Sequence, residues 1–261
     1  MRRFLLGFVL ALCAGLAGPA WPADGKAVGV DPDAVARLSG TDRILEVGAD
    51  ISLGEQVVTG PSGQVQVVFS DGTRLVVGPG SALLIESYLF NGNTADKFAI
   101  NALAGSFRFI SGNSPKSAYS IRTPTASIAI RGTKFDFNVT RRRTDVLLYE
   151  GAVQLCAAGG DCAELVARCH LGSVDAGSAS LLLPADPDHL PLSQQFRYAR
   201  FQVPLLSDFR IAGATRCTEP PATGGVPDTL GTTVGGDNPT RSPAGAPTPT
   251  PTPTPRPVVR N

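Results

Sequence analysis

The sequence predicts an all-β domain, and three observations support this prediction. Between residues 42 and 177, short runs rich in Val, Ile, Leu and Phe are separated by Gly, Asn, Asp and Pro at roughly ten-residue spacing, which is typical of β-sandwiches and barrels. Within Ser120–Val139 apolar and polar residues alternate, as in a strand with one buried face. The pair Asp71-Gly72 separates two apolar runs and is a strong hairpin signal, because the tight turn needs positive φ.

The first residues are typical of an export signal. Arg2 and Arg3 precede an apolar run over residues 4–18, and Ala20 or Ala23 offers a small residue for cleavage. The run is shorter than the ~20 residues that a membrane-spanning helix needs. We therefore expect a cleaved signal peptide at residues 1–23, no stable membrane span, and a periplasmic or secreted mature protein.

A lead-in over residues 24–47 follows, in which we expect Asp31–Leu38 to form one short helix or a turn. The strands of the domain are then expected at Gln64–Phe69, Thr73–Val77, Leu83–Ile85, Phe98–Ile100, Ser106–Ile110, Tyr119–Arg122, Phe135–Val139, Val146–Tyr149 and Ala152–Leu155. Gly132-Thr133 lies between two alternating runs, which predicts a bulge or a corner that changes the strand direction.

The C-terminal part of the chain has a different composition. Residues 178–218 are rich in Leu, Phe and Val, so we expect an extension that docks on the domain, with a helix at Leu192–Arg200. In residues 219–261 Pro, Gly and Thr dominate. Because proline fixes φ and supplies no amide donor, this segment is expected to be a disordered tail that samples extended conformations. A spacer is the favoured role for the tail, and partner binding is the alternative.

Charge and cysteine content exclude several classes of function. The formal net charge is +1, so no overall field attracts nucleic acid or anionic lipid.

Four cysteines follow the signal peptide, namely Cys156, Cys162, Cys169 and Cys217, and an even number in an oxidising compartment predicts disulfides. The short loop between Cys156 and Cys162 lets these two meet, which leaves Cys169 to join Cys217. No Cys-x-x-Cys pair suggests zinc.

The sequence offers little for catalysis. His170 and His189 are its two histidines, and neither accompanies a Gly-x-Ser-x-Gly or His-Glu-x-x-His motif. The run that contains Asp186, Asp188 and His189 is better explained as an exposed turn between two prolines than as a metal site. We expect no catalytic, cofactor-binding or metal-binding residue.

Five segments within residues 48–177 form an ordered set of motifs. They are Gly54–Gly60; Phe69–Ser81, with Asp71, Gly72 and Thr73; Leu103–Phe109, with Gly105; Thr123–Phe137, with Thr123, Pro124, Ala126, Gly132, Thr133 and Phe135; and Glu150–Val153, with Glu150 and Gly151. Together they resemble the FecR periplasmic-domain family. The resemblance implies a jelly-roll-like β-sandwich, with a flattened β-solenoid as the alternative. The motif residues are mostly architectural, since several are glycines suited to turns with positive φ.

The FecR family senses and relays signals at the bacterial envelope. The resemblance therefore implies a non-catalytic exported protein that binds an envelope protein such as a receptor or a sensor, and an exposed sheet edge offers a physical route. The alternative is a module that binds peptidoglycan or another glycan, but one Trp and four Tyr are few aromatic side chains for stacking on sugars. Family regulators typically carry a cytoplasmic sigma-factor segment and a membrane span before this domain. Because an export signal comes first here, we do not expect a direct anti-sigma role.

Overall fold

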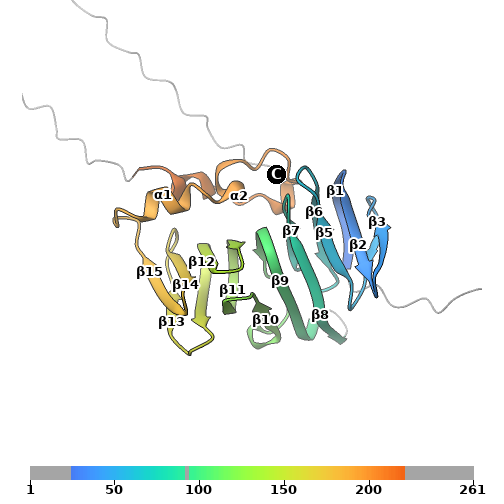
Figure 1. The fold of residues 1–261 in the computed structure, drawn as a ribbon, viewed down its shortest axis with the longest axis horizontal. Helices are drawn as coiled ribbons and strands as arrows, with labels where there is room; N and C mark the ends of the chain where they lie inside the picture. The colour runs from blue at the N-terminus through green and yellow to red at the C-terminus, as the bar shows by residue number, and fades with distance from the viewer. Residues whose placement is uncertain (1–24, 92–93, 221–261) are drawn as a thin grey trace, which may run out of the picture. The chain divides into compact units, whose positions relative to one another are not determined.

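Strands account for most of the structure, a computed structural model that describes residues 25–91 and 94–220 (Figure 1). The expected signal peptide, residues 1–23, and residues 221–261 of the expected tail lie outside the described residues. The strands are β1 (Gly25–Asp31), β2 (Ala34–Leu38), β3 (Thr41–Ile44), β4 (Asp50–Ile51), β5 (Gln56–Thr59), β6 (Gln64–Phe69), β7 (Arg74–Val77), β8 (Ala82–Asn91), β9 (Thr94–Ile110), β10 (Tyr119–Arg122), β11 (Ala126–Val139), β12 (Arg143–Ala157), β13 (Cys162–Leu165), β14 (Leu171–Asp175) and β15 (Ser178–Leu182). The helical elements are η1 (Lys116–Ala118), α1 (His189–Ser193), α2 (Arg197–Arg200), η2 (Ser207–Phe209) and η3 (Ala214–Thr218).

The strands form one open sheet that folds back on itself into two facing layers. Layer A contains β3, β2, β5, β8, β10 and β13, and layer B contains β4, β1, β6, β7, β14 and β15. All pairs are antiparallel except β9 with β10. Three long strands, β9, β11 and β12, contribute to both layers; the first part of β9 pairs with β8 and β10, and its last part pairs with β7 and β11. The prediction of an all-β, sandwich-like fold is confirmed.

Glycines stand where the three long strands pass from one layer to the other. Gly105 in β9, Gly132 in β11 and Gly151 in β12 have φ values of 115°, 65° and 84°, which residues with a side chain rarely adopt. A Cβ atom on Gly151 would lie 2.1 Å from the carbonyl oxygen of Gly132, so these two corners touch. The β11–β12 register shifts between Arg131 and Lys134. The corner predicted at Gly132-Thr133 is therefore present.

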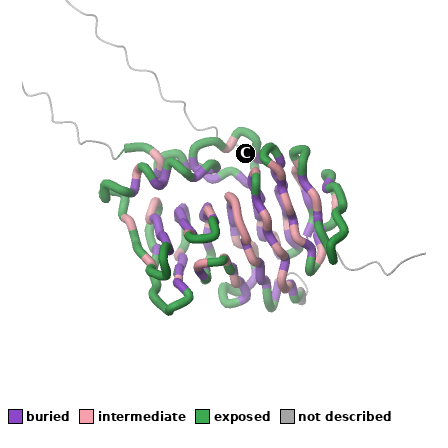
Figure 2. Tube along the Cα trace, in the orientation of Figure 1, coloured by how far each residue is buried: buried purple, intermediate pink, exposed green. Residues whose placement is uncertain are grey.

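The main hydrophobic core lies between the two layers. Phe135, Phe137 and Val139 of β11 point into it and are fully or almost fully buried, as their alternation predicts. Phe137 stacks on Phe107 of β9, with ring centroids 4.8 Å apart. Figure 2 shows buried positions concentrated in the strands and exposed positions at the loops around the rim.

Truncation of Phe137 tests this packing. Phe137→Ala is expected to lower the free energy of unfolding by about 3–4 kcal/mol, because it removes a buried ring and leaves a cavity. Arg142→Ala, in the exposed turn between β11 and β12, is the control and is expected to change it by less than about 0.5 kcal/mol. Urea unfolding measures both. Equal effects of the two substitutions would contradict the packing described here.

The prediction of a helix or turn at Asp31–Leu38 is wrong for most of that segment. Its first residue ends β1, which pairs with β6 and β4, and residues 34–38 form β2, which pairs with β3 and β5. The turn is confined to Pro32 and Asp33, where Asp33 has a φ of 76°. Ala34 and Ala36 are buried whereas Arg37 is exposed, which is the period-two pattern of a strand. Small alanines made this pattern hard to recognise.

The last part of the described chain, residues 183–218, covers the outer face of layer B. The single helix predicted at Leu192–Arg200 is instead two short helices, α1 and α2, which Figure 1 shows running above the strands. Apolar side chains of this extension form two clusters with the outer face of the sheet, one around Phe196 and Leu147 and one around Phe209 and Val76. No helix of residues 25–91 and 94–220 is long and apolar enough to cross a membrane.

Candidate functional site

The Asp-Gly-Thr motif is the centre of a buried hydrogen-bond cluster. Gly72 has a φ of 82°, as the hairpin requires. The Asp71 carboxylate accepts hydrogen bonds from the Thr73 amide at 2.9 Å, the Thr73 hydroxyl at 2.9 Å, the Ser114 hydroxyl at 2.5 Å and the Tyr119 hydroxyl at 2.8 Å. Asp71 and Thr73 are fully buried. Asp71 thus joins the β6–β7 hairpin to the segment that leads into β10.

The Thr-Pro segment makes a hydrogen-bonded turn between β10 and β11. The Thr123 hydroxyl oxygen accepts from the amides of Thr125 and Ala126 at 3.3 and 2.9 Å. The hydroxyl groups of Thr123 and Thr125 both contact that of Thr144, at 2.8 and 2.7 Å. Pro124 stands at the exposed tip of this turn. The segment therefore fixes the β10–β11 connection against β12.

The other motif and titratable residues also have structural partners. Glu150 forms an exposed ion pair with Lys134, 2.7 Å between Oε2 and Nζ. Cys156 is bonded to Cys162, with 2.06 Å between the sulfur atoms. Cys169 is bonded to Cys217, which ties the extension to the sheet. These are the two pairs that the spacing predicts.

The two histidines lie near the Cys169–Cys217 bridge. Buried His189 forms a 2.6 Å hydrogen bond through Nε2 with the Cys169 carbonyl. Nδ1 of His170 accepts a hydrogen bond from the Val166 amide at 3.4 Å, and burial, with His189 nearby, lowers the pKa of His170. In the described part of the chain, no group of three or more His, Cys, Asp and Glu side chains could hold a metal ion.

A buried arginine fastens the extension to layer B. Arg108 of β9 is fully buried and forms a two-point ion pair with Asp136 of β11, at 2.7 and 2.9 Å. Its guanidinium also donates to the backbone carbonyls of Tyr198 and Phe209 in the extension, at 2.8 and 3.2 Å, and to the Gln202 side chain. This group cannot bind an external ligand, because its donors are used within the fold.

Electrostatics explains why these charges remain buried. Burial by itself lowers the pKa of the Arg108 guanidinium, but the adjacent Asp136 carboxylate more than offsets this, and the pKa lies above its usual value. Burial, together with Asp136, raises the pKa of Tyr149 well above its usual range. The Tyr149 hydroxyl therefore stays protonated and donates to Asp136 at 2.6 Å.

The outer face of layer A has a different character, because side chains of β11, β12 and β13 are exposed on it. Strand pairing aligns Ala129, Gln154 and Glu164 across these three strands. Ala129, Gln154 and Glu164 are exposed. We call this surface the open face. Small side chains in the middle and longer polar ones at the side leave it hollowed.

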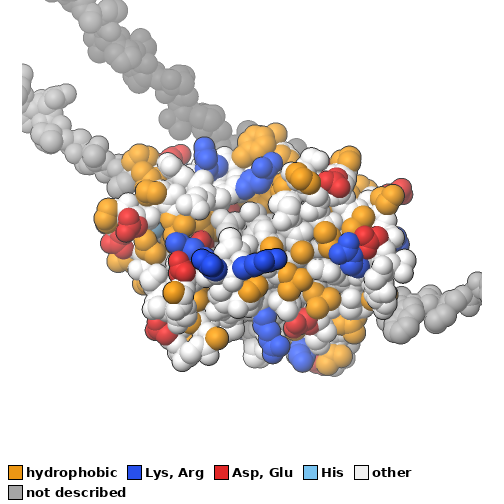
Figure 3. Space-filling model, in the orientation of Figure 1, with side chains coloured by type: hydrophobic (Ala, Val, Ile, Leu, Met, Phe, Trp, Pro, Cys, Tyr) orange, Lys and Arg blue, Asp and Glu red, His pale blue; other side chains and the backbone are white. Residues whose placement is uncertain are grey.

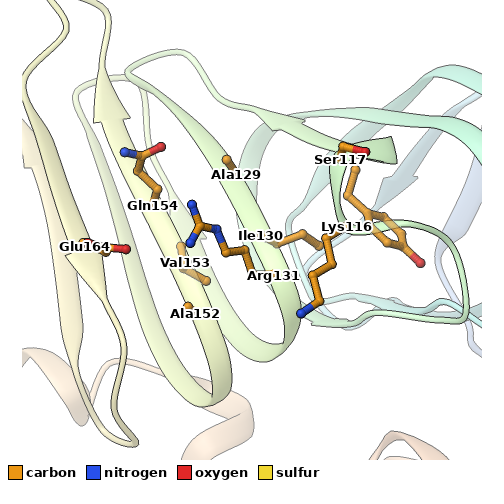
Figure 4. A pocket seen from close by; sticks show the side chains of 10 residues that line it. Lys116, Ser117, Ala129, Ile130, Arg131, Ala152, Val153, Gln154 and Glu164 are labelled. Atoms are coloured by element: carbon orange, nitrogen blue, oxygen red, sulfur yellow. The ribbon is translucent and has the colours of Figure 1, made fainter.

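A groove of about 390 Å³ lies on the open face, where η1, β11, β12 and β13 meet (Figure 4). Its lining includes Ala129, Ala152, Lys116, Arg131 and Glu164. In Figure 4 the Arg131 side chain extends towards the strand that carries Gln154 and Val153. Neither Lys116 nor Arg131 forms an ion pair with another described residue. The groove therefore offers two exposed cations to an approaching partner.

Basic and aromatic side chains are the groups that nucleic-acid and sugar-binding surfaces use most. On the face that Figure 3 shows, the Lys and Arg side chains are scattered among acidic and apolar ones instead of forming one basic patch. Tyr88, Tyr119, Tyr149 and Tyr198 are all buried, and among the described aromatic side chains only Phe201, in the extension, is markedly exposed. The open face therefore has no exposed aromatic ring among its described residues, since Tyr119 of the groove lining is buried.

Comparison with known proteins supports one family. Residues 55–154 match the family model described as FecR protein, which confirms the resemblance over this part of the chain. No curated protein matches the sequence.

Solved structures give a weaker similarity. Two crystal structures of a protein from Parabacteroides distasonis ATCC 8503, provisionally described as an anti-sigma factor, align with a TM-score of 0.42 and 14% identity. The alignments cover 54% of this chain and 64% or 63% of those chains. The matched region is thus less than two thirds of their length, and the similarity is too low to support an inference.

Proposed function

We propose that this protein, whose residues 55–154 match the FecR family, is a non-catalytic exported protein that senses or relays a signal by binding another protein of the envelope. The observation that carries the proposal is the contrast between the two outer faces of the sandwich. The extension and the Arg108 cluster occupy the face of layer B, whereas the open face presents a groove with two unpaired cations.

The remaining features fit this proposal. The Cys156–Cys162 and Cys169–Cys217 bonds suit an oxidising compartment. We propose that residues 1–23 are removed on export and that residues 219–261 serve as a spacer. The expected domain limits of 48 and 177 need widening, because β1, β2 and β3 before them and β15 after them are strands of the same sheet. We therefore propose that the docked extension begins at residue 183. Binding of peptidoglycan or another glycan is less well supported, because it favours exposed aromatic rings for stacking. Among the described residues of the open face no aromatic ring is exposed, and Tyr119, which lines the groove, is buried.

The groove makes a testable contribution to partner binding. A photo-crosslinking residue at Ala129, on the exposed surface of β11, is expected to capture a second protein in intact cells. The double substitution Lys116→Glu and Arg131→Glu should lower that capture about tenfold, because reversal of two interface charges readily costs more than the ~1.4 kcal/mol that a tenfold change requires.

Arg142→Glu is the matched control, since Arg142 is also an exposed cation but lies in the β11–β12 turn at the far end from the groove. Capture that survives the double reversal would remove the groove from the binding surface. Capture of glycan fragments and no protein would favour the carbohydrate-binding alternative.

A further inference from the structure

The sheet is open, so some strands have a neighbour on one side only. Within residues 25–91 and 94–220 these are β3, β4, β13 and β15. A free edge presents backbone N–H and C=O groups to which another strand can pair, and proteins usually protect such edges. The edges of β15 and β3 differ sharply in this protection.

Carboxylates block the edge of β15. The Ala179 amide donates to Asp161 at 2.8 Å, and the Leu183 amide donates to Asp186 at 2.7 Å. Because backbone groups alternate in direction along a strand, Ala179, Leu181 and Leu183 face the same edge. Two of the three outward amides are therefore already bonded within the chain.

The edge of β3 has no such protection. The Leu45 amide donates to the Ala34 carbonyl, and from there hydrogen-bonded and non-hydrogen-bonded pairs alternate along β2 and β3. The backbone groups of Asp42 and Ile44 therefore point away from β2. Neither has a backbone partner among the described residues.

The side chains around β3 are apolar or already paired. Ile44 and Val47 are 75% and 67% exposed, and Leu38 and Leu53 are also exposed. Asp42 is held by Arg37 through two contacts of 2.6 and 2.9 Å, so its carboxylate is engaged with a side chain and does not cap the edge. Covering this surface would remove exposed apolar side chains from water, which is favourable in free energy.

We propose that β3 accepts an extended segment of a partner protein as an added strand, paired to the backbone of Asp42 and Ile44. The partner segment lacks proline at the paired positions and carries an apolar side chain that covers Ile44. This inference rests on the proposed function, since it names how the partner protein attaches.

A second copy of this chain is a poor occupant. Antiparallel pairing requires outward-facing residues of the two strands to lie opposite each other. Two-fold pairing centred on Asp42 puts the Asp42 side chains of both copies opposite each other, and pairing centred on Arg43 does the same for the two Arg43 side chains. Pairing centred on Ile44 puts Asp42 of each copy opposite Glu46 of the other. Like charges directly opposite each other are destabilising. The edge is therefore better suited to a different protein.

In-cell crosslinking with the full-length protein tests the inference. A photo-crosslinking residue at Val47, beside the edge, is expected to capture a second protein. Ile44→Pro, which removes one outward amide, should lower this capture at least tenfold, whereas Ile44→Ala, which keeps the amide, should lower it two- to threefold. Leu181→Pro places proline at the equivalent position of the protected β15 edge and should leave capture unchanged.

The outcomes separate this inference from the proposed function. Capture at Ala129 but not at Val47, equal loss in Ile44→Pro and Ile44→Ala, or a product that is a dimer of this chain each overturn strand addition while partner binding stands. No captured protein at either position overturns both. Thermal unfolding confirms that the Ile44→Pro protein is folded, and Asp42→Pro, which removes the other outward amide, replaces it if it is not.

Discussion

Replacing Asp71 with alanine is expected to lower the free energy of unfolding by about 5 kcal/mol, because each buried donor that loses its partner costs about 1–3 kcal/mol. Four hydrogen bonds end on this one carboxylate, from the Thr73 amide and hydroxyl, Ser114 and Tyr119. Asp71 is fully buried, so water cannot replace it. A loss of this size is comparable to the whole stability of many domains.

Two further variants sharpen the Asp71 test. Asp71→Asn keeps the size of the side chain but turns one oxygen into a donor that faces other donors, so it is expected to cost about half as much as alanine. Asp96→Ala removes an exposed carboxylate and should stay within about 0.5 kcal/mol. Urea unfolding of the three variants measures their losses in free energy of unfolding and so the order of these losses. A loss at Asp71→Ala no larger than that at Asp96→Ala would show that the cluster does not stabilise the fold.

Arg108→Met is expected to lower the free energy of unfolding by a similar amount, about 5 kcal/mol, because removal of one partner of a buried ion pair costs about 3–5 kcal/mol by itself. The substitution leaves the almost fully buried Asp136 carboxylate without its cation. It also removes the donors to the Tyr198 and Phe209 carbonyls. The extension should then be cleaved faster than the sheet in limited proteolysis.

A double-mutant cycle identifies the ion pair as the cause. Arg108→Met combined with Asp136→Leu should cost about 2 kcal/mol less than the sum of the single substitutions, because the double variant leaves no unpaired charge. Arg122→Met, at a largely exposed arginine of β10, is the control and should have little effect. Strict additivity in the cycle would mean that Arg108 and Asp136 act independently, contrary to the geometry.

Period-two patterns and turn residues predict much of this fold from the sequence alone. The inward face of Phe135 and Phe137, the Asp71-Gly72 hairpin and the corner at Gly132 follow from local alternation and from the need for positive φ. The same rules missed β1 and β2, because small residues, glycine and alanine, mark their buried faces. A proline near Asp31 also suggested the start of a helix.

The two buried polar clusters and the open face depend on contacts between distant parts of the chain, and the sequence does not show them. Arg108 alternates with Phe107 and Phe109, so an outward-facing position could be predicted for it. That the extension would cover this position depends on packing between residues about 90–100 positions apart in the chain. Asp71 looked like an ordinary turn residue, since its partners Ser114 and Tyr119 are distant in sequence. The open face emerges only when strand register places Ala129 and Gln154 side by side.

The passage of β9, β11 and β12 through both layers has a mechanical consequence. Where the two sheets of a sandwich are joined only by loops, no continuous strand resists their sliding past each other. Here β9, β11 and β12 run without interruption from one layer into the other. Any sliding of the layers would have to bend these strands at Gly105, Gly132 and Gly151. A force that a partner applies at the open face should therefore move both layers together as one rigid body, with little displacement of one layer relative to the other.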